Sequence, residues 1–96
     1  MPSAYILADV DVKDPAAYEE YKRLSSIAMK AHGAEVCVRG GPVSVLEGDW
    51  SPRRAVLLKF PSVEKARAFY DSPEYHAARK AREGIAVMRM VVIEGV

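Results

Sequence analysis

Arginine, lysine and aspartate side chains occur on predicted strands, where they alternate with aliphatic residues. Arg39 is the first candidate for binding a ligand, because Gly40 and Gly41 follow it and a guanidinium beside accessible backbone can bind a carboxylate or a phenolate. The other candidate ligand-binding residues add positive charge, hydroxyl groups and an indole ring: Tyr5, Trp50, Lys59, Tyr75 and Arg89. For the aromatic residues, packing in the core or across an interface is the alternative interpretation.

Two residues could move a proton in such a pocket. Asp9 lies on the first predicted strand, and His76 follows Tyr75 near the start of a predicted helix. His76 could be a general base or a heme-facing ligand at the mouth of the pocket; the alternative is an exposed, solvated histidine. Asp9 and Glu35 could instead pair with cations on neighbouring strands, in which case this face would only form an interface.

The sequence contains no recognisable metal or nucleophile motif. His32, Cys37 and His76 are scattered, without the spacings typical of zinc sites. Cys37 has no nearby histidine in the sequence, and neither a nucleophile elbow nor a phosphate-binding loop is present. His32 precedes Gly33 at the end of a predicted helix, where a positive charge interacts favourably with the helix dipole. We therefore expect neither a metal nor a cofactor.

The composition is typical of a single small globular domain over residues 1–96. Half of the residues are hydrophobic, 28% are charged, and the formal net charge is +1. This balance provides no positive surface for nucleic acid, and no apolar stretch approaches the length that crosses a membrane. No charged and then apolar leader precedes the first predicted strand, and Cys37 is the only cysteine. We expect a cytoplasmic protein.

Hydrophobic periodicity predicts four strands and three helices. The strands span Ala4 to Val12, Ala34 to Arg39, Arg54 to Phe60 and about Val87 to Glu94. The first helix starts at Asp14-Pro15 and ends at His32-Gly33. Two short helices follow one another between residues 60 and 84, with Ser62 and Ser72 as N-caps and Gly84 as the final cap. This order is typical of an α+β, ferredoxin-like split βαβ sandwich with an antiparallel four-stranded sheet.

Each predicted strand has one wholly apolar phase, which should lie beneath the helices. Its members are Ile6, Ala8, Val10, Val36, Val38, Val56, Leu58, Phe60, Met88, Met90 and Val92. The opposite phase mixes aliphatic residues with Asp9, Arg39, Lys59 and Arg89, which is too polar for a core and too apolar for a solvated face. We therefore predict that a second copy of the sheet covers it, forming a homodimeric barrel with a partly polar cleft.

The segment after the second predicted strand is expected to be irregular. Gly40-Gly41-Pro42 predicts a bulge or sharp bend, because glycine allows unusual backbone angles and proline is disfavoured in a central strand. Residues 43–46 would continue as an extended arm, and residues 47–52 have the composition of a turn.

Three stretches occur in order along almost the whole chain: ADVDVKDPAAYEEYK, VRGGPVSVLEGDWSPRR and FPSVEKARAFYDSPEYHAAR. They resemble an uncharacterised family of the dimeric α/β-barrel superfamily, related to antibiotic-biosynthesis-type monooxygenases and chlorite-dismutase-like proteins. The resemblance implies a ferredoxin-like barrel dimer, but no reaction, because the superfamily hosts many. The family motif falls on Arg39, Gly40, Gly41, Glu47, Gly48, Trp50, Phe60, Tyr70, Ser72 and Tyr75.

Three functions stay open at this point. The first is a homodimer that binds a small anionic or aromatic organic molecule and acts as a cofactor-independent oxygenase or isomerase. In it Arg39 would orient the ligand, and His76 or Asp9 would move a proton. The second is a non-catalytic binding or stress-associated protein that uses the same cavity, and the third is a structural dimer without a ligand.

Overall fold

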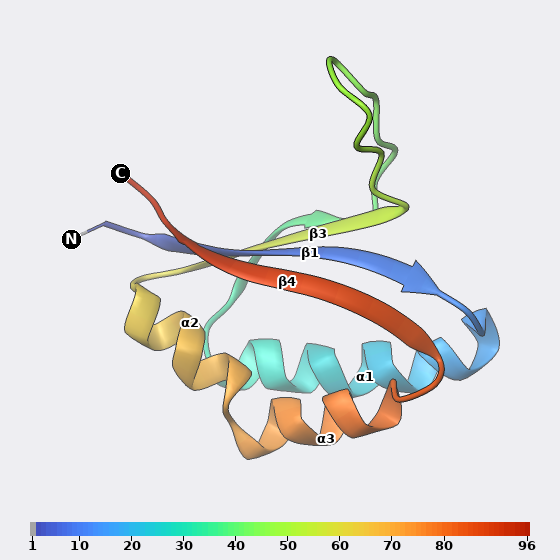
Figure 1. Ribbon diagram of the computed structural model, residues 1–96. Coiled ribbons are helices and arrows are strands. Elements are labelled where there is room, and N and C mark those ends of the chain that lie inside the picture. Colours follow the sequence, from blue (N-terminus) through green and yellow to red (C-terminus); the bar gives the residue numbers. More distant parts are fainter. Residues whose placement is uncertain (1) are drawn as a thin grey trace.

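The computed structural model describes residues 2–96 and shows one sheet covered on one face by helices (Figure 1). The elements, in chain order, are β1 (Ala4–Val12), α1 (Pro15–Ala31), β2 (Glu35–Arg39), β3 (Arg54–Phe60), α2 (Val63–Tyr70), α3 (Pro73–Ala81) and β4 (Ala86–Glu94). The strands are antiparallel in the order β2-β3-β1-β4. The predicted ferredoxin-like α+β fold is therefore confirmed.

The helices begin at the residues that the sequence marks as caps. The side chain of Asp14 accepts a hydrogen bond from the backbone N–H of Ala17, and Pro15 occupies the first turn of α1. Ser62 and Ser72 accept equivalent hydrogen bonds at the starts of α2 and α3. Each bond satisfies an N–H that has no partner within the helix, so the break between α2 and α3 is encoded locally.

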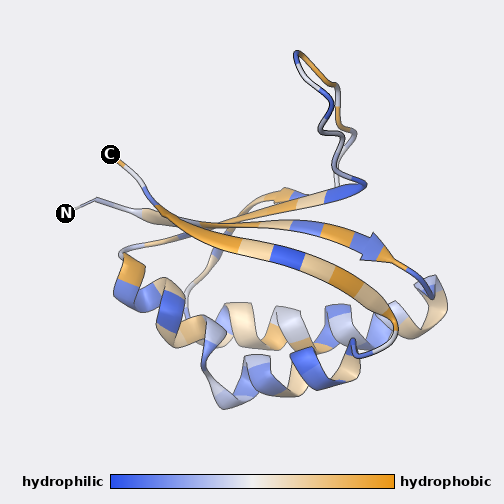
Figure 2. Ribbon diagram, in the orientation of Figure 1, coloured by the Kyte–Doolittle hydropathy of each residue, from blue (hydrophilic) through white to orange (hydrophobic). Residues whose placement is uncertain are grey.

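The core lies between the helices and the inward face of the sheet. Its fully or nearly buried members alternate along β1 and β3 and recur at helical spacing: Ala4, Ile6, Ala8, Val10, Tyr18, Tyr21, Ala28, Met29, Leu58, Phe60, Ala66, Phe69, Tyr75 and Ala78. Phe69 packs against both Phe60 and Tyr75, with ring centroids 5.2 and 4.7 Å apart. Figure 2 shows the same division, with hydrophobic residues along the sheet and largely hydrophilic helices.

A bulge in β2 corrects the predicted register of this strand. Val36 pairs with Leu58, but Val38 pairs with Leu57 and Arg39 with Val56, so the ladder shifts at Cys37 rather than at Gly40-Gly41. Because one inserted residue exchanges the two faces of a strand, Val38 turns to the open face and Arg39 turns towards the helices. The prediction that Arg39 lies on the mixed face with Asp9 is wrong for this reason.

The other face of the sheet is covered by no helix or strand of the described chain. Exposed aliphatic residues of β4 lie on it, namely Val87, Val91 and Ile93, beside half-buried Leu7 and Leu57. Residues 41–53, which we call the arm, form no helix or strand and project from the sheet on this side (Figure 1). The arm exposes Val43, Val45, Leu46 and Trp50, so hydrophobic surface continues beyond the sheet.

Candidate functional site

A narrow cavity lies between α1 and the inward face of the sheet. Its walls are mostly apolar and aromatic, and they come from every helix and strand: Ile6, Ala8, Val10, Tyr18, Tyr21, Lys22, Ser25, Met29, Arg39, Arg54, Val56, Leu58, Phe69, Tyr75, Met88 and Met90. The free volume is about 30 Å³, which corresponds to about one water molecule. The interior of the cavity is therefore apolar and tight.

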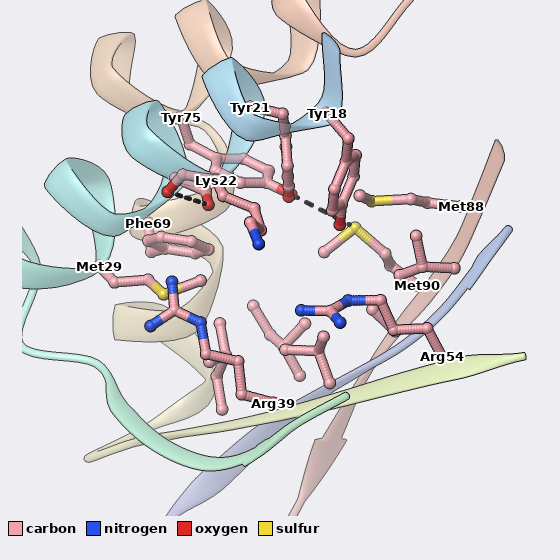
Figure 3. A pocket seen from close by; sticks show the side chains of 16 residues that line it. Tyr18, Tyr21, Lys22, Met29, Arg39, Arg54, Phe69, Tyr75, Met88 and Met90 are labelled. Atoms are coloured by element: carbon pink, nitrogen blue, oxygen red, sulfur yellow. Dashed lines mark hydrogen bonds between the residues drawn. The ribbon is translucent and has the colours of Figure 1, made fainter. Parts of the chain in front are cut away.

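Three cationic side chains lie where this cavity opens. Lys22 comes from α1, Arg39 from the end of β2 and Arg54 from the start of β3. Figure 3 shows their nitrogen atoms directed towards the same space. Among the lining residues of the described chain there is no aspartate or glutamate, so positive potential is concentrated at an apolar opening.

The three cations differ in how far they are already neutralised. The ammonium group of Lys22 lies 2.7 Å from the carboxylate of Glu19, outside the cavity. Nη2 of Arg39 donates a hydrogen bond of 2.6 Å to the hydroxyl of Ser26, which is uncharged. For Arg39 and Arg54 no carboxylate lies within ion-pair distance in residues 2–96. Both guanidinium groups can therefore bind an anion.

Arg54 is held in place by two neighbours. Its guanidinium carbon lies 5.9 Å from the centre of the Tyr18 ring, within the range of a cation–π contact. It also packs against Gly40, where φ is +74° and where an added Cβ would collide with the guanidinium. The Nε atom of Arg54 is buried and has no hydrogen-bond partner in the described residues. The site thus contains a buried donor that a ligand could satisfy.

Two phenols meet inside the cavity. The hydroxyl groups of Tyr21 and Tyr75 lie 2.6 Å apart, and Tyr75 donates to the sulfur of Met90 at 3.7 Å. Because the hydrogen of Tyr75 is directed to Met90, Tyr21 donates to Tyr75. Burial is the largest cause that raises the pKa of both phenols, as it does for Tyr18, where the charge of Arg54 partly opposes it. These groups are therefore neutral hydrogen-bond donors at ordinary pH, not bases.

The structure places five of the predicted site residues outside this cavity, four on the open face of the sheet and Trp50 on the arm. Asp9 pairs with Arg89 across β1 and β4 at 3.2 Å, and the indole N–H of Trp50 lies 3.5 Å from the same carboxylate. Lys59 pairs with Tyr5 in the register of β1 and β3. Such cross-strand pairing of Asp9 was the alternative expectation. Within one chain, these residues are not brought together with Arg39.

The remaining predicted residues lie on α3. Tyr75 is buried and lines the cavity, and its role in binding a ligand stays a prediction. His76 is exposed and lies beside a shallow depression lined by Arg79, Lys80 and Glu83, away from the phenols. His76 and Asp9 both lie outside the cavity. Their catalytic roles stay predictions. His32 links α1 to α3 through a contact of 3.0 Å with Glu74, and this contact lowers the pKa of that carboxyl.

Sequence reasoning missed Lys22 and Arg54. Arg54 occupies the same strand phase as Val56, Leu58 and Phe60, so its inward direction could have been read from the alternation. Lys22 follows Tyr21 on α1 and lies four residues after Tyr18, a spacing that places it near the inward stripe. Arg39 could not have been placed on this side without knowing the bulge.

The described residues contain no group of three or more potential metal ligands, and none of their helices is long and apolar enough to span a membrane. The sequence matches, over residues 3–96, the model of a family described as a domain of unknown function, DUF1330. This chain belongs to the DUF1330 family. A search of curated proteins finds no match.

Solved structures share the fold of this DUF1330 chain. A protein of unknown function from Rhodopseudomonas palustris superposes with a TM-score of 0.77 at 22% identity, covering 99% of this chain and 83% of that one. A dimeric ferredoxin-like protein of unknown function from Thermobifida fusca gives 0.65 at 17%, covering 97% and 91%. SnoaB, a cofactor-independent oxygenase from Streptomyces nogalater, gives 0.62 at 10%, covering 97% and 92%. The predicted resemblance to uncharacterised and monooxygenase-like barrel proteins is confirmed.

Proposed function

We propose that this protein binds a small organic anion between α1 and the sheet, with Arg39 and Arg54 as the charged contacts. The observation that carries the proposal is the pair of guanidinium groups without a carboxylate partner at the opening of an apolar, aromatic cavity. A planar guanidinium suits a carboxylate or phenolate, because two parallel hydrogen bonds fix its orientation. The cavity has room for about one water molecule, so the hydrocarbon part of the ligand would enter between its apolar walls as Met88 and Met90 change conformation.

The proposed active form is a homodimer joined through the open faces of two sheets. Exposed aliphatic residues on β4 and on the arm form a hydrophobic surface, and contact of such a surface with water is unfavourable. Proteins of similar fold from Thermobifida fusca and Bacteroides fragilis are described as dimeric. Asp9 and Arg89 supply both charges on each copy, so the same patch can be complementary to itself, as a two-fold interface requires.

A second candidate function is catalysis on the bound anion. The observation that favours it is the buried Tyr21–Tyr75 pair, which lies in the cavity with both phenols protonated. Neutral phenols can donate hydrogen bonds to an oxyanion that develops during a reaction. An oxygenase or isomerase without a cofactor would need this kind of support, and the similar fold of SnoaB is consistent with it. A binding protein without catalysis is the alternative.

The cytoplasmic location stays a prediction.

A thermal-shift screen with small carboxylic acids and phenols tests the binding proposal. A ligand that binds only the folded state stabilises it by RT ln(1 + [L]/Kd), so the melting temperature rises with the logarithm of a ligand concentration well above Kd. We expect stabilisation of the wild-type protein and its loss in Arg39→Ala and in Arg54→Ala. The matched control is Arg23→Ala, which removes the same charge from an exposed position of α1 where Arg23 pairs with Glu20 at 2.6 Å.

Stabilisation that survives in both cavity variants would disprove binding at this site. A screen in which no carboxylate or phenol raises the melting temperature would favour a dimer without a ligand. For catalysis, the best ligand is incubated aerobically without added metal or flavin, and products are followed by mass spectrometry. We expect Tyr75→Phe to retain binding and to lower turnover about 10²-fold or more, the usual loss when an oxyanion donor is removed. The hydrogen of Tyr21 is already donated to Tyr75, whereas that of Tyr75 is donated only to the sulfur of Met90, a weak acceptor.

A further inference from the structure

Two buried donors lack a partner in the part of the chain that the structure describes. They are Nε of Arg54 and Nε of Arg82. Within residues 2–96, no other buried side-chain nitrogen or oxygen is unpaired. Buried polar groups are nearly always hydrogen-bonded in folded proteins, so each unpaired one requires an explanation. Both belong to guanidinium groups, which donate to carboxylates and other acceptor-rich groups.

The two guanidinium groups flank one aromatic stack. Arg54 lies 5.9 Å from the ring centre of Tyr18, and Arg82 lies 5.9 Å from that of Tyr21. The rings of Tyr18 and Tyr21 are stacked on each other, with centroids 5.1 Å apart. The charge of Arg82 also acts on the phenols, partly opposing the rise in the pKa of Tyr75. Arg54 and Arg82 therefore lie at opposite ends of a tyrosine pair that forms one wall of the cavity.

Arg82 lines a second opening, on the β4 side of the helix layer. This groove has a volume of about 470 Å³ and is bordered by Arg67, Tyr70 and Asp71 as well as by residues of β4. Two arginines face one carboxylate there, and no ion pair joins Asp71 to either of them in the described residues. The groove, like the cavity mouth on the β2 side, therefore carries an excess of positive charge.

The cavity and the groove share one wall. Ile6, Met88 and Met90 line both of them. Methionine side chains have three rotatable bonds and adapt easily to a neighbour, so Met88 and Met90 form a movable partition. The cavity by itself has room for about one water molecule, whereas the groove is more than ten times larger. A ligand that is bound by Arg39 and Arg54 and reaches further between the helices and the sheet would pass the methionines, towards Arg82.

We infer that the ligand of this site is an elongated molecule with an acidic or acceptor-rich group at each end, such as a dicarboxylate. One end would bind Arg39 and Arg54, the middle would lie along the tyrosine stack and displace Met88 and Met90, and the other end would bind Arg82. This inference rests on the proposed anion binding and adds the class of ligand. It gives both unpaired Nε donors an acceptor from the same molecule.

The test compares straight-chain dicarboxylates of four to ten carbons with monocarboxylates of the same length, by titration calorimetry. For wild-type protein we expect one range of chain lengths in which the dicarboxylate binds at least ten-fold more tightly. Arg82→Gln should abolish this preference and leave monocarboxylate binding within two-fold. Lys80→Gln, an exposed change on α3 that also removes one positive charge, should keep the preference. Circular dichroism and melting curves confirm that each variant is folded.

The outcomes separate the two proposals. Monocarboxylates that bind as tightly as dicarboxylates at every length, with binding lost in Arg39→Ala, would overturn the inference and support the proposed function. A dicarboxylate preference that persists in Arg82→Gln would also overturn it, since another group would then hold the second acid. If neither series binds the wild-type protein, both proposals fail.

Discussion

The two faces of the sheet carry similar residue types but use them differently. On the open face both aspartates of β1 are paired: Asp9 with Arg89 at 3.2 Å, and Asp11 with Lys13 at 2.7 Å and Arg53 at 3.8 Å. On the helix side, Arg39 and Arg54 face an apolar cavity without a carboxylate. The cations beside the aspartates of β1 therefore have partners within the chain, whereas Arg39 and Arg54 can bind an anion from outside.

The hydrophobic residues of the two faces also differ in how far they are buried. Inward residues such as Phe69 and Ala4 are fully buried, whereas Val91 on the open face is 54% exposed. Exposure of this size at Val87, Val91 and Ile93 of β4, continued by hydrophobic residues of the arm, is typical of an interface. One face of the sheet is covered by helices of the same chain, whereas in the proposed dimer the other would be covered by a second copy.

The largest expected effect comes from placing a charge on the open face. Val91→Asp would bury an unpaired carboxylate between two sheets, which weakens an interface by about 3 kcal/mol or more, roughly a hundred-fold in Kd. We expect sedimentation at micromolar concentration to show a dimer for the wild-type protein and a monomer for the variant.

Ile27→Asp is the control for this change, because Ile27 is 49% exposed on α1, away from the open face. It should leave the oligomeric state unchanged. A wild-type monomer, or a Val91→Asp variant that remains dimeric, would show that the open face is not the interface.

A smaller effect is expected at the base of the arm. Gly40 has φ of +74°, and a Cβ there would meet the guanidinium of Arg54. Gly40→Ala combines an unfavourable backbone conformation, about 1–2 kcal/mol, with displacement of Arg54. We expect a lower melting temperature in thermal denaturation and weaker binding of carboxylates in titration calorimetry.

Gly41→Ala is the matched control, since Gly41 does not have a positive φ and no atom lies within 4 Å of its added Cβ. Its stability should remain within about 0.5 kcal/mol of the wild-type value. Equal effects of the two substitutions would mean that the contact between Gly40 and Arg54 does not position the arginine.

Much of the fold could be predicted because its signals are local. Asp14, Ser62 and Ser72 cap helices through residues three positions further along the chain, and such pairs are visible in the sequence. The apolar phases of β1, β3 and β4 also follow directly from alternation. These features determined the element order and the helix-covered face.

The cavity could be predicted only in part, because its mouth depends on long-range geometry. Arg39 reaches it through a bulge at Cys37, which is set by pairing with β3 and not by the neighbouring sequence. Lys22, Arg39 and Arg54 are far apart in the chain, and only the packing of α1 on the β2 side of the sheet brings them together. Alternation therefore assigned Arg39 to the wrong face.

The smallest expected effect concerns the buried phenols and is seen at alkaline pH. The pKa of Tyr21 is raised above its ordinary value of 10.0 in the folded protein, mainly by burial and then by Tyr75. The unfolded chain loses the phenolic proton near pH 10, while the folded chain keeps it, so the free energy of unfolding falls as the pH rises above 10. The slope is about 1.4 kcal/mol per pH unit for each such phenol.

Tyr21→Phe should therefore change the pH dependence more than the stability itself. At pH 7 the variant loses one hydrogen bond, about 1 kcal/mol, and between pH 10 and 11 the difference from wild type should shrink or reverse. Urea denaturation at a series of pH values measures it. Ser25→Ala, a buried position of α1 that does not titrate in this range, should show a constant offset. A constant offset for Tyr21→Phe as well would mean that this phenol is not protected from ionisation by the fold, and that the helix side of the sheet is more open to water than its burial indicates.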